Sequence, residues 1–423
     1  MKKIGVGILG LGTVGGGTYK ILTENHNNIV CKENLDIQVI KVLERSVERA
    51  LQKGVPESKV AASIDEITAN NDIDIVVEVI GGIEPAKTFI SKCLMSGKSV
   101  VTANKELISK HWTELEEIAK KHNCGLYFEA SCLGGVPIIR SLVEGLQANN
   151  ITELAGIFNG TTNYILTKMS EDNMSYTDCL AEAQNLGYAE ADPTSDVEGF
   201  DTMYKLSILS TLAFGKRIPL DKIYREGITR ITKSDIESGK ELGYTIKLLA
   251  IGKMYNNSLE VRVHPAFVPD EHPLATVRGS FNAIHLVGNY VGEIMLYGKG
   301  AGDLPTGSAI VSDIIYCAHI SEPRYVRFDC SVNETSLVTD FKSKYYMLIN
   351  CVDKPGVLSQ TTAVLGKHEV SIESIIQKGK HKEFARVVFL THETSELSMM
   401  NAIEELKKLN VVDSVESVIR VLD

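Results

Sequence analysis

Two groups of residues in this chain have the types and spacing that chemistry requires. The first is Gly10-Leu11-Gly12-Thr13-Val14-Gly15, which follows an apolar run and precedes a helical stretch. In that setting the first glycine permits a tight turn, the second lets the backbone approach a pyrophosphate, and the third allows close packing of helix on strand. The helix N-terminus adds unpaired N–H groups for the phosphates. The motif predicts a dinucleotide site, and the alternative is a glycine-rich turn without a ligand.

The second group is Asp201 and Lys205, which are four residues apart and share one face of an expected helix. An exposed pair of this kind contributes only about 0.3–0.5 kcal/mol. The helix continues with the mostly apolar residues 206–212, however, which indicates burial. A charged pair in a buried helix needs compensating partners or a function. Both interpretations stay open here, a salt bridge and part of an active site.

The elements that must position these residues begin with strands alternating with helices. Strands are expected at 4–9, 37–43, 74–80 and 99–102, and a helix at 14–25. Such alternation predicts a parallel, doubly wound sheet. Gly81-Gly82 and Lys105 follow the third and fourth strands, and the carboxyl ends of strands are where open α/β sheets bind ligands. Alone, the glycines could make only a turn, and Lys105 could only begin a helix.

The pattern then changes twice along the chain. Helices are expected at 137–148, 175–187 and 199–213, followed by a β-rich region at 259–263 and 283–296 and by a helix at 306–317 that crosses back. From residue 344 the order is βαββαβ, the split ferredoxin-like plan. The predicted fold class is therefore α/β with three domains. They are a Rossmann domain at 1–130 with a return segment at about 305–340, an α+β substrate and dimerisation domain at 131–304, and the βαββαβ domain at 344–423.

Composition excludes several classes of function. A length of 423 residues suggests two or three domains, and a net charge of −10 argues against nucleic-acid binding. No apolar run approaches the ~20 residues that span a bilayer. The eight cysteines form no CxxC pair, so neither a zinc site nor a disulfide framework is expected. These features predict a cytoplasmic protein with reduced thiols.

Further segments, taken with the glycine motif, resemble the homoserine dehydrogenases. They are GGIEPA at 81–86, TANK at 102–105, EAS at 129–131, NGTTNY at 159–164, GYAEADP at 187–193, and GAG at 300–302 with Pro305-Thr306. The last eighty residues resemble an ACT domain, as in the long bacterial form of this family. Gly307 departs from the alanine usual in the family, which bears only on local helix packing. The resemblance implies NAD(P)-dependent interconversion of L-homoserine and L-aspartate 4-semialdehyde, in threonine and methionine biosynthesis.

The resemblance also implies roles for single residues. Lys205 would be the catalytic acid/base, and Lys105 a second cation beside substrate and nicotinamide. Glu190 and Asp201 would bind the substrate ammonium, and Thr161 would hydrogen-bond the substrate, with a helix N-cap as its alternative role. The remaining positions are listed by ligand: for the cofactor Gly10, Leu11, Gly12, Thr13, Val14, Gly15, Arg45, Gly81, Lys105, Gly187 and Gly302; for a monovalent cation such as sodium, held largely by main-chain carbonyls, Glu129, Cys132, Gly134 and Val136.

Several alternatives stay open. Glu44 could bind the ribose of NAD and Arg45 the 2′-phosphate of NADP, and we favour NADP through Arg45. The turn at 351–358 of the ACT-like domain could bind an amino-acid effector such as threonine, or the domain could serve dimerisation alone. A homodimer or larger assembly is expected. The chain could also be a Rossmann dehydrogenase of another small hydroxy acid or aldehyde, or a non-catalytic NAD(P)-binding regulator.

Overall fold

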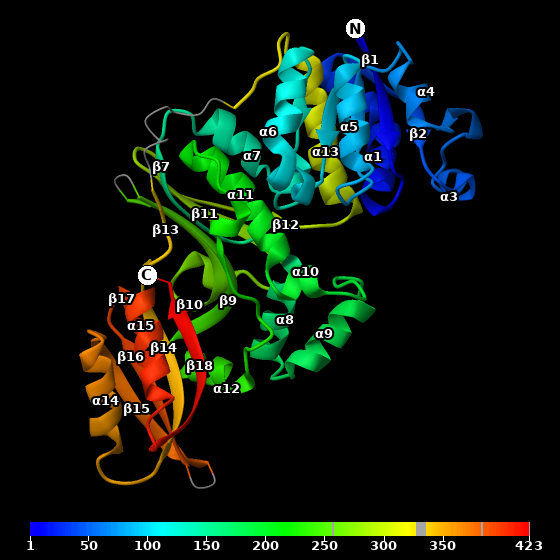
Figure 1. Cartoon of the computed structure of the whole chain (residues 1–423). Coiled ribbons are helices and arrows are strands. Elements are labelled where there is room, and N and C mark those ends of the chain that lie inside the picture. The colour runs from blue at the N-terminus through cyan, green and yellow to red at the C-terminus, as the bar shows by residue number, and fades with distance from the viewer. Residues whose placement is uncertain (256–257, 327–335, 382–383, 423) are drawn as a thin grey trace.

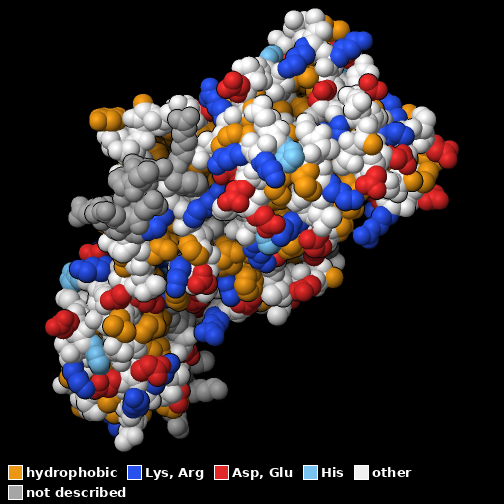
Figure 2. Space-filling model, turned by 45° about the horizontal axis from the view of Figure 1, so that its top comes forward, with side chains coloured by type: hydrophobic (Ala, Val, Ile, Leu, Met, Phe, Trp, Pro, Cys, Tyr) orange, Lys and Arg blue, Asp and Glu red, His pale blue; other side chains and the backbone are white. Residues whose placement is uncertain are grey.

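The computed structural model describes residues 1–255, 258–326, 336–381 and 384–422. The chain forms three parts arranged in a row, with the N-terminal sheet at one end and the C-terminal unit at the other (Figure 1). Residues 327–335, which include Cys330 and part of the expected return segment, lie outside the described residues. None of the helices in the described part of the chain combines the length and apolarity that a bilayer crossing requires. Acidic and basic side chains are interspersed over the face shown in Figure 2.

The first sheet is parallel and has the order β3-β2-β1-β4-β5-β6. It grows outward from β1 in both directions, so the expected doubly wound class is confirmed, and a crevice for ligands is expected where the order reverses between β1 and β4. All four predicted strands are present, with ends that differ by two residues at most. The strands are β1 (Lys2–Leu9), β2 (Leu35–Leu43), β3 (Val60–Ala61), β4 (Ile75–Glu78), β5 (Ser99–Thr102) and β6 (Leu126–Tyr127).

Helices cover both faces of this sheet. One of them, α13 (Asp303–His319), comes from much later in the chain and packs against α1 (Thr13–Glu24). Gly307 lies at this contact, where a Cβ atom would stand only 2.9 Å from the Thr18 nitrogen. The departure from the family's alanine therefore lets the two helix backbones approach closely. The other helices are α2 (His26–Glu33), α3 (Val47–Gln52), α4 (Ile64–Thr68), α5 (Ala86–Met95) and α6 (Lys105–Lys121).

The second sheet is mixed and runs in the order β12-β11-β7-β9-β10-β18-β14-β16-β15. Its middle-region strands are β7 (Ile151–Ile157), β9 (Tyr244–Tyr255), β10 (Ser258–Pro269) and the hairpin β11 (Phe281–Gly288) and β12 (Gly292–Lys299). Helices α8 (Gly160–Glu171), α11 (Phe200–Phe214) and α12 (Lys233–Glu241) pack on these strands, while α9 (Tyr176–Asn185) and α10 (Thr194–Val197) lie beside α8. The helix expected at 137–148 is shorter, because α7 (Ile138–Arg140) passes into a π turn at Ser141–Gly145.

The C-terminal unit confirms the βαββαβ order. Its elements are β14 (Lys342–Val352), α14 (Val357–Lys367), β15 (Ile372–His381), β16 (Phe384–Thr391), the short β17 (Thr394–Ser395), α15 (Glu396–Leu406) and β18 (Val412–Val421). Strand β18 pairs with β10 in parallel, so one sheet runs without a break from the middle region into this unit. Two more short strands, β8 (Tyr224–Arg225) and β13 (Ser336–Val338), pair with the same strand β10.

Candidate active site

A cavity of about 470 Å³ lies between the first sheet and helix α11. The glycine turn after β4, the start of α6 and the segment at 190–196 also line it. Five of the residues singled out in the sequence meet there, namely Val14, Gly81, Lys105, Glu190 and Asp201. The cavity thus opens at the carboxyl ends of the parallel strands, the place expected for a ligand.

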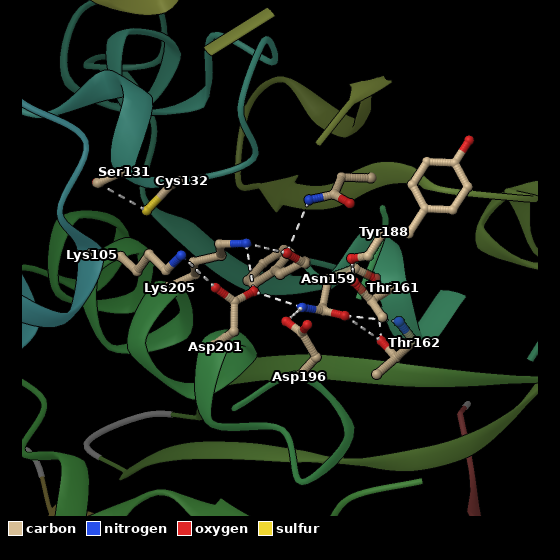
Figure 3. A network of polar contacts seen from close by, with 12 residues as sticks. Lys105, Ser131, Cys132, Asn159, Thr161, Thr162, Tyr188, Asp196, Asp201 and Lys205 are labelled. Carbon is tan, nitrogen blue, oxygen red and sulfur yellow. Dashed lines mark hydrogen bonds and ion pairs between the residues drawn. The ribbon is translucent and has the colours of Figure 1, made fainter. Parts of the chain in front are cut away.

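Asp201 is the centre of a cluster of two lysines. The Lys205 ammonium lies 2.7 Å from Asp201 Oδ2, and the Lys105 ammonium lies 3.1 Å from Oδ1. Figure 3 shows both ammonium groups pointing at this carboxylate, one from α11 and one from the start of α6. Lys205 also donates to the Phe158 carbonyl at 2.7 Å. The predicted contact within α11 is confirmed, and so is the burial of both its members.

Charge compensation decides the ionisation of this cluster. Burial alone would raise the pKa of Asp201, but the Lys205 and Lys105 ammonium groups outweigh burial and hold that pKa well below its usual value. The Asp201 carboxylate in turn raises the pKa of Lys105. Asp201 therefore stays ionised at neutral pH, and it holds Lys105 in the wall of the cavity and Lys205 beside it.

Asn159, which belongs to the NGTTNY motif but was given no role in the sequence, supports Asp201. Asn159 donates one amide hydrogen bond to Asp201 at 2.9 Å and another to Asp196 at 2.6 Å. Burial and the nearby Asp201 charge raise the pKa of Asp196. Asn159 also caps α8, since its side-chain oxygen accepts from the Thr162 N–H at 2.8 Å. An asparagine directly before a helical Gly-Thr-Thr is the signal that could have identified this cap.

Thr161 is placed beside the cavity and not in its wall. Its hydroxyl donates to the Tyr188 carbonyl at 2.6 Å, so it ties α8 to the GYAEADP segment. The alternative role of Thr161 as an N-cap is wrong, because Asn159 occupies that position. Gly187, directly before Tyr188, is exposed and takes a φ of +76°. Glu190 is exposed as well, at the rim of the cavity.

The glycine motif has the geometry that a dinucleotide loop requires. Gly10 takes a φ of +92°, and a Cβ on Gly15 would stand 2.2 Å from the Gly10 carbonyl oxygen. No atom lies within 4 Å of a Cβ built on Gly12, so its surface is open to a ligand. Gly302 caps the start of α13 with a φ of +129°, and Asp303, the next residue, touches Gly17 of α1. The predicted tight turn at Gly10 and close helix–strand packing at Gly15 are thus present in the structure.

The turn after β4 is held by a buried carboxylate that the sequence did not reveal. Glu78 accepts from the Ile80 and Gly81 N–H groups through one oxygen and from the Thr102 hydroxyl through the other. Burial raises the pKa of Glu78. This bonding joins the Gly81-Gly82 turn to the TANK segment, and it fixes one wall of the cavity.

Glu44 and Arg45 differ in how they are engaged at the end of β2. The Glu44 carboxylate accepts from the Leu11 N–H at 2.9 Å and from the Ser46 N–H at 3.3 Å. Through its bond to the Leu11 N–H, Glu44 therefore holds the glycine loop in place. Arg45 is exposed.

The segment expected to bind a cation is a tight, buried loop. Glu129, Cys132, Gly134 and Val136 are all buried. The Glu129 carboxylate accepts from the Ile139 and Arg140 N–H groups at 2.8 and 2.7 Å, so it caps α7. Burial and the Asp313 charge raise the pKa of Glu129 to about 7. Within the described residues, no group of three or more His, Cys, Asp or Glu side chains could hold a metal ion.

Taken together, the cavity offers the Lys105 ammonium group and the Asp201 carboxylate beside a strand-end glycine loop, and the buried Lys205 ammonium group contacts that same carboxylate. A buried lysine held by a carboxylate can exchange a proton with a substrate oxygen, and the exposed Glu190 can accept from a cationic substrate group. This combination suits proton transfer coupled to dinucleotide chemistry on a small, charged substrate.

Protein-family models match three stretches of the chain. Residues 10–129 match the NAD binding domain of homoserine dehydrogenase, 137–315 match homoserine dehydrogenase, and 345–411 match the ACT domain. A homoserine dehydrogenase of Bacillus subtilis is 41% identical over 100% of this chain and 99% of its own length.

Solved structures agree with the sequence matches. A crystal structure of a homoserine dehydrogenase from Thiobacillus denitrificans has a TM-score of 0.93 at 39% identity, and the match covers 100% of this chain and 99% of that one. A hyperthermophilic archaeal homoserine dehydrogenase in complex with NADPH has a TM-score of 0.65 at 29% identity, over 76% of this chain and 100% of its own.

Proposed function

This chain belongs to the homoserine dehydrogenase family, and from that premise we propose how its residues carry the reaction. The enzyme is an NAD(P)-dependent oxidoreductase that interconverts L-homoserine and L-aspartate 4-semialdehyde. The observation that supports our assignment of roles is the Lys105–Asp201–Lys205 cluster, of which Lys105 and Asp201 line the cavity. Initial rates with L-homoserine, with other small hydroxy acids and with NAD⁺ and NADP⁺ test the substrate directly. We further propose a role in cytoplasmic threonine and methionine biosynthesis.

Lys205 is the proposed acid/base. When bound, the nicotinamide cofactor supplies the hydride chemistry, and the protein supplies orientation and proton transfer. During reduction of the aldehyde, the Lys205 ammonium donates a proton to the forming alkoxide. During oxidation, neutral Lys205 accepts the proton of the carbinol. Lys105 is the second cation near the substrate oxygen, and Asp201 holds both lysines in place.

Glu190 is the proposed acceptor of the substrate ammonium, together with Asp201. Both line the cavity, but Asp201 already binds two lysines and Asn159. Glu190→Gln is therefore expected to raise KM for homoserine roughly 10- to 100-fold with little change in kcat, because the variant loses one charge-assisted hydrogen bond to the substrate ammonium. Asp201→Asn should lower kcat as well, because it also loosens the two lysines.

Steady-state kinetics of both variants check this division of roles. Glu114→Gln is the control, since that exposed carboxylate of α6 pairs with Lys87 of α5 and does not line the cavity. An unchanged KM in Glu190→Gln would remove Glu190 from the ammonium site. For Thr161 we propose an indirect role: its hydrogen bond to the Tyr188 carbonyl holds the segment that carries Glu190.

NADP is the proposed preferred cofactor. Arg45 is exposed at the end of β2, whereas both Glu44 oxygens accept backbone N–H groups and are less available to a ribose. The archaeal relative in complex with NADPH supports the same choice. The proposed contacts run from Gly10 to Gly15 and through Gly81, Lys105, Gly187 and Gly302.

Arg45→Ala is expected to raise KM for NADP⁺ by about tenfold or more and to leave KM for NAD⁺ nearly unchanged, because only NADP⁺ presents a 2′-phosphate to the guanidinium. Kinetics with both cofactors measure the difference. Arg49→Ala is the matched control, an exposed arginine four residues along that pairs with Glu44. Equal losses with the two cofactors would exclude Arg45 as the discriminating residue.

A monovalent cation such as sodium is proposed at the buried loop of Glu129, Cys132, Gly134 and Val136. The loop fits such an ion because its donors are neutral carbonyl oxygens, each of which can accept twice. The Glu129 and Val136 carbonyls use one acceptor position each, for the Cys132 and Ile138 N–H groups. A bound cation would stiffen the connection between the first sheet and α7.

The remaining proposals concern organisation. We assign a Rossmann domain to 1–130 with the return segment at about 305–340, a substrate and dimerisation domain to 131–304, and an ACT domain to 344–423. A homodimer or larger assembly is proposed. The turn between β14 and α14 is the proposed site for an amino-acid effector, threonine in particular, and Gly356 there takes a φ of +85° with open space around it.

A further inference from the structure

Arg420 connects the C-terminal unit with the middle region. It lies on β18 with 2% of its surface exposed, and its guanidinium binds residues on both sides. On its own side it donates to both oxygens of Glu396 in α15. Across the boundary it donates to Glu226 at 2.8 Å and to the Tyr224 hydroxyl at 2.7 Å. A buried arginine shared by two carboxylates fixes the elements that carry them relative to each other.

The backbone places these partners next to each other along one strand. Tyr224 and Arg225 of β8 pair with residues 262 and 263 of β10. Arg420 and Val421 of β18 pair with residues 266 and 267 of the same strand. Strands β8 and β18 therefore pair with successive segments of β10, and the Arg420 side chain of β18 reaches Tyr224 in β8 and Glu226 just after it.

The segment after β8 in turn supports the start of helix α11. Arg225 donates to the Glu198 carbonyl, and its guanidinium lies 3.6 Å from the centre of the Phe200 ring. The Ile228 N–H donates to the Val197 carbonyl at 2.8 Å. Gly227 allows this contact, since a Cβ there would stand 2.3 Å from the Val197 oxygen. Residues 197–200 thus rest on residues 225–228, and Asp201 is the next residue along α11.

We propose that Arg420 is a positioning residue for the reaction. By holding Tyr224 and Glu226, Arg420 fixes the position of residues 225–228, on which residues 197–200 pack. It thereby fixes the start of the helix that carries Asp201 and Lys205. The active site then depends on a side chain of the last strand of the C-terminal unit. This inference rests on the roles proposed above for Asp201 and Lys205.

Arg420→Met in the full chain is the first test. We expect kcat for homoserine oxidation to fall roughly 2- to 30-fold, the range for residues that act through a network, with KM changed less. The pH profile of kcat should be displaced, because the geometry of the Asp201–Lys205 pair controls its charge. Arg420→Lys should restore part of the rate. Hydrogen exchange of the amides at 198–205 should become faster in Arg420→Met.

Arg386→Met is the matched control. Arg386 on β16 also crosses the boundary, donating to Ser234 of α12 at 2.6 Å, but α12 does not carry the catalytic residues. Equal losses of rate and equal exchange in the two variants would mean general destabilisation and would overturn the proposal.

If Arg420→Met does not fold, Glu226→Gln tests the positioning role of Arg420 instead. It keeps the buried Arg420–Glu396 pair and removes only the charge on the middle-region side. As for Arg420→Met, we expect a lower kcat, a displaced pH profile of kcat and faster hydrogen exchange of the amides at 198–205. Unchanged kcat and exchange in a folded variant would overturn the positioning role. A wild-type chain that does not oxidise homoserine would refute the proposed function instead, and the exchange measurement would still test the link.

Discussion

Lys205→Ala is expected to lower kcat for homoserine oxidation about 10²- to 10⁴-fold, the usual contribution of a positioned acid or base. KM should change much less, because the lost proton transfer matters in the transition state. The fold should survive, since Asp201 keeps Lys105 at 3.1 Å and Asn159 at 2.9 Å. The absorbance of the reduced nicotinamide measures the rate, and circular dichroism checks the fold.

Lys168→Ala provides the matched control for this variant. Lys168, near the end of α8, pairs with Asp172 at 2.8 Å and with Glu182 at 3.3 Å, but these pairs lie at the surface. Its loss should leave kcat unchanged and cost only about 0.3–0.5 kcal/mol of stability. A folded Lys205→Ala enzyme with nearly wild-type kcat would leave the salt-bridge interpretation of Lys205 as the correct one.

Saturating L-threonine is expected to weaken the affinity of the full chain for homoserine about 5- to 150-fold, the range of typical coupling free energies. The physical requirement is that threonine binds one conformational or assembly state better than another. The proposed site is the turn before α14, whose N-terminus has no side-chain cap and so leaves N–H groups for a carboxylate. Titration of the initial rate at several threonine concentrations measures the shift.

A pair of glycine substitutions locates the effector. Gly356→Ala should abolish the response, because a Cβ at a φ of +85° costs about 1–2 kcal/mol and distorts the turn. Gly366→Ala, near the other end of α14, also meets open space and should leave the response intact. If the wild-type chain ignores threonine and related amino acids at saturation, the regulatory proposal fails.

Deletion of the C-terminal unit from Lys344 onward would answer a different question. Such a deletion removes β18 from the edge of β10 and exposes Phe267, whose ring lies 5.0 Å from that of Tyr346. Loss of activity in that truncation would therefore report a disrupted sheet as readily as a lost effector site. Point variants in the full chain avoid this ambiguity.

Local patterns predicted the short apolar runs that end at turn-forming residues. The apolar runs around residues 4–9 and 99–102 fixed strands of the first sheet, and the glycine motif correctly assigned the turn at Gly10 and the close packing at Gly15. The spacing of Asp201 and Lys205, together with the apolar helix around them, predicted their buried contact. Each of these inferences needs only neighbours in the sequence.

Features that depend on distant partners could not be predicted in this way. Strand β9 is buried throughout residues 246–252, so its apolar run lacks the alternation that separates strand from helix. The contact of Lys105 with Asp201 joins segments almost a hundred residues apart, and the local sequence around either residue does not predict the other as its partner. Glu78 and Asn159 carry out their roles through hydrogen bonds that leave no periodic signal.

The pairing of β10 with β18 sets an order for the biogenesis of this enzyme. The paired residues lie about 150 positions apart, so at roughly 5–20 residues per second a ribosome needs on the order of 10–30 s to supply the second strand. Until then the edge of β10 at residues 266–267 and the carboxylate of Glu226 lack their final partners. The edge of β10 in the nascent chain is thus open to pairing with other chains during that interval, and a chain released early by a premature stop codon would keep this edge open to aggregation.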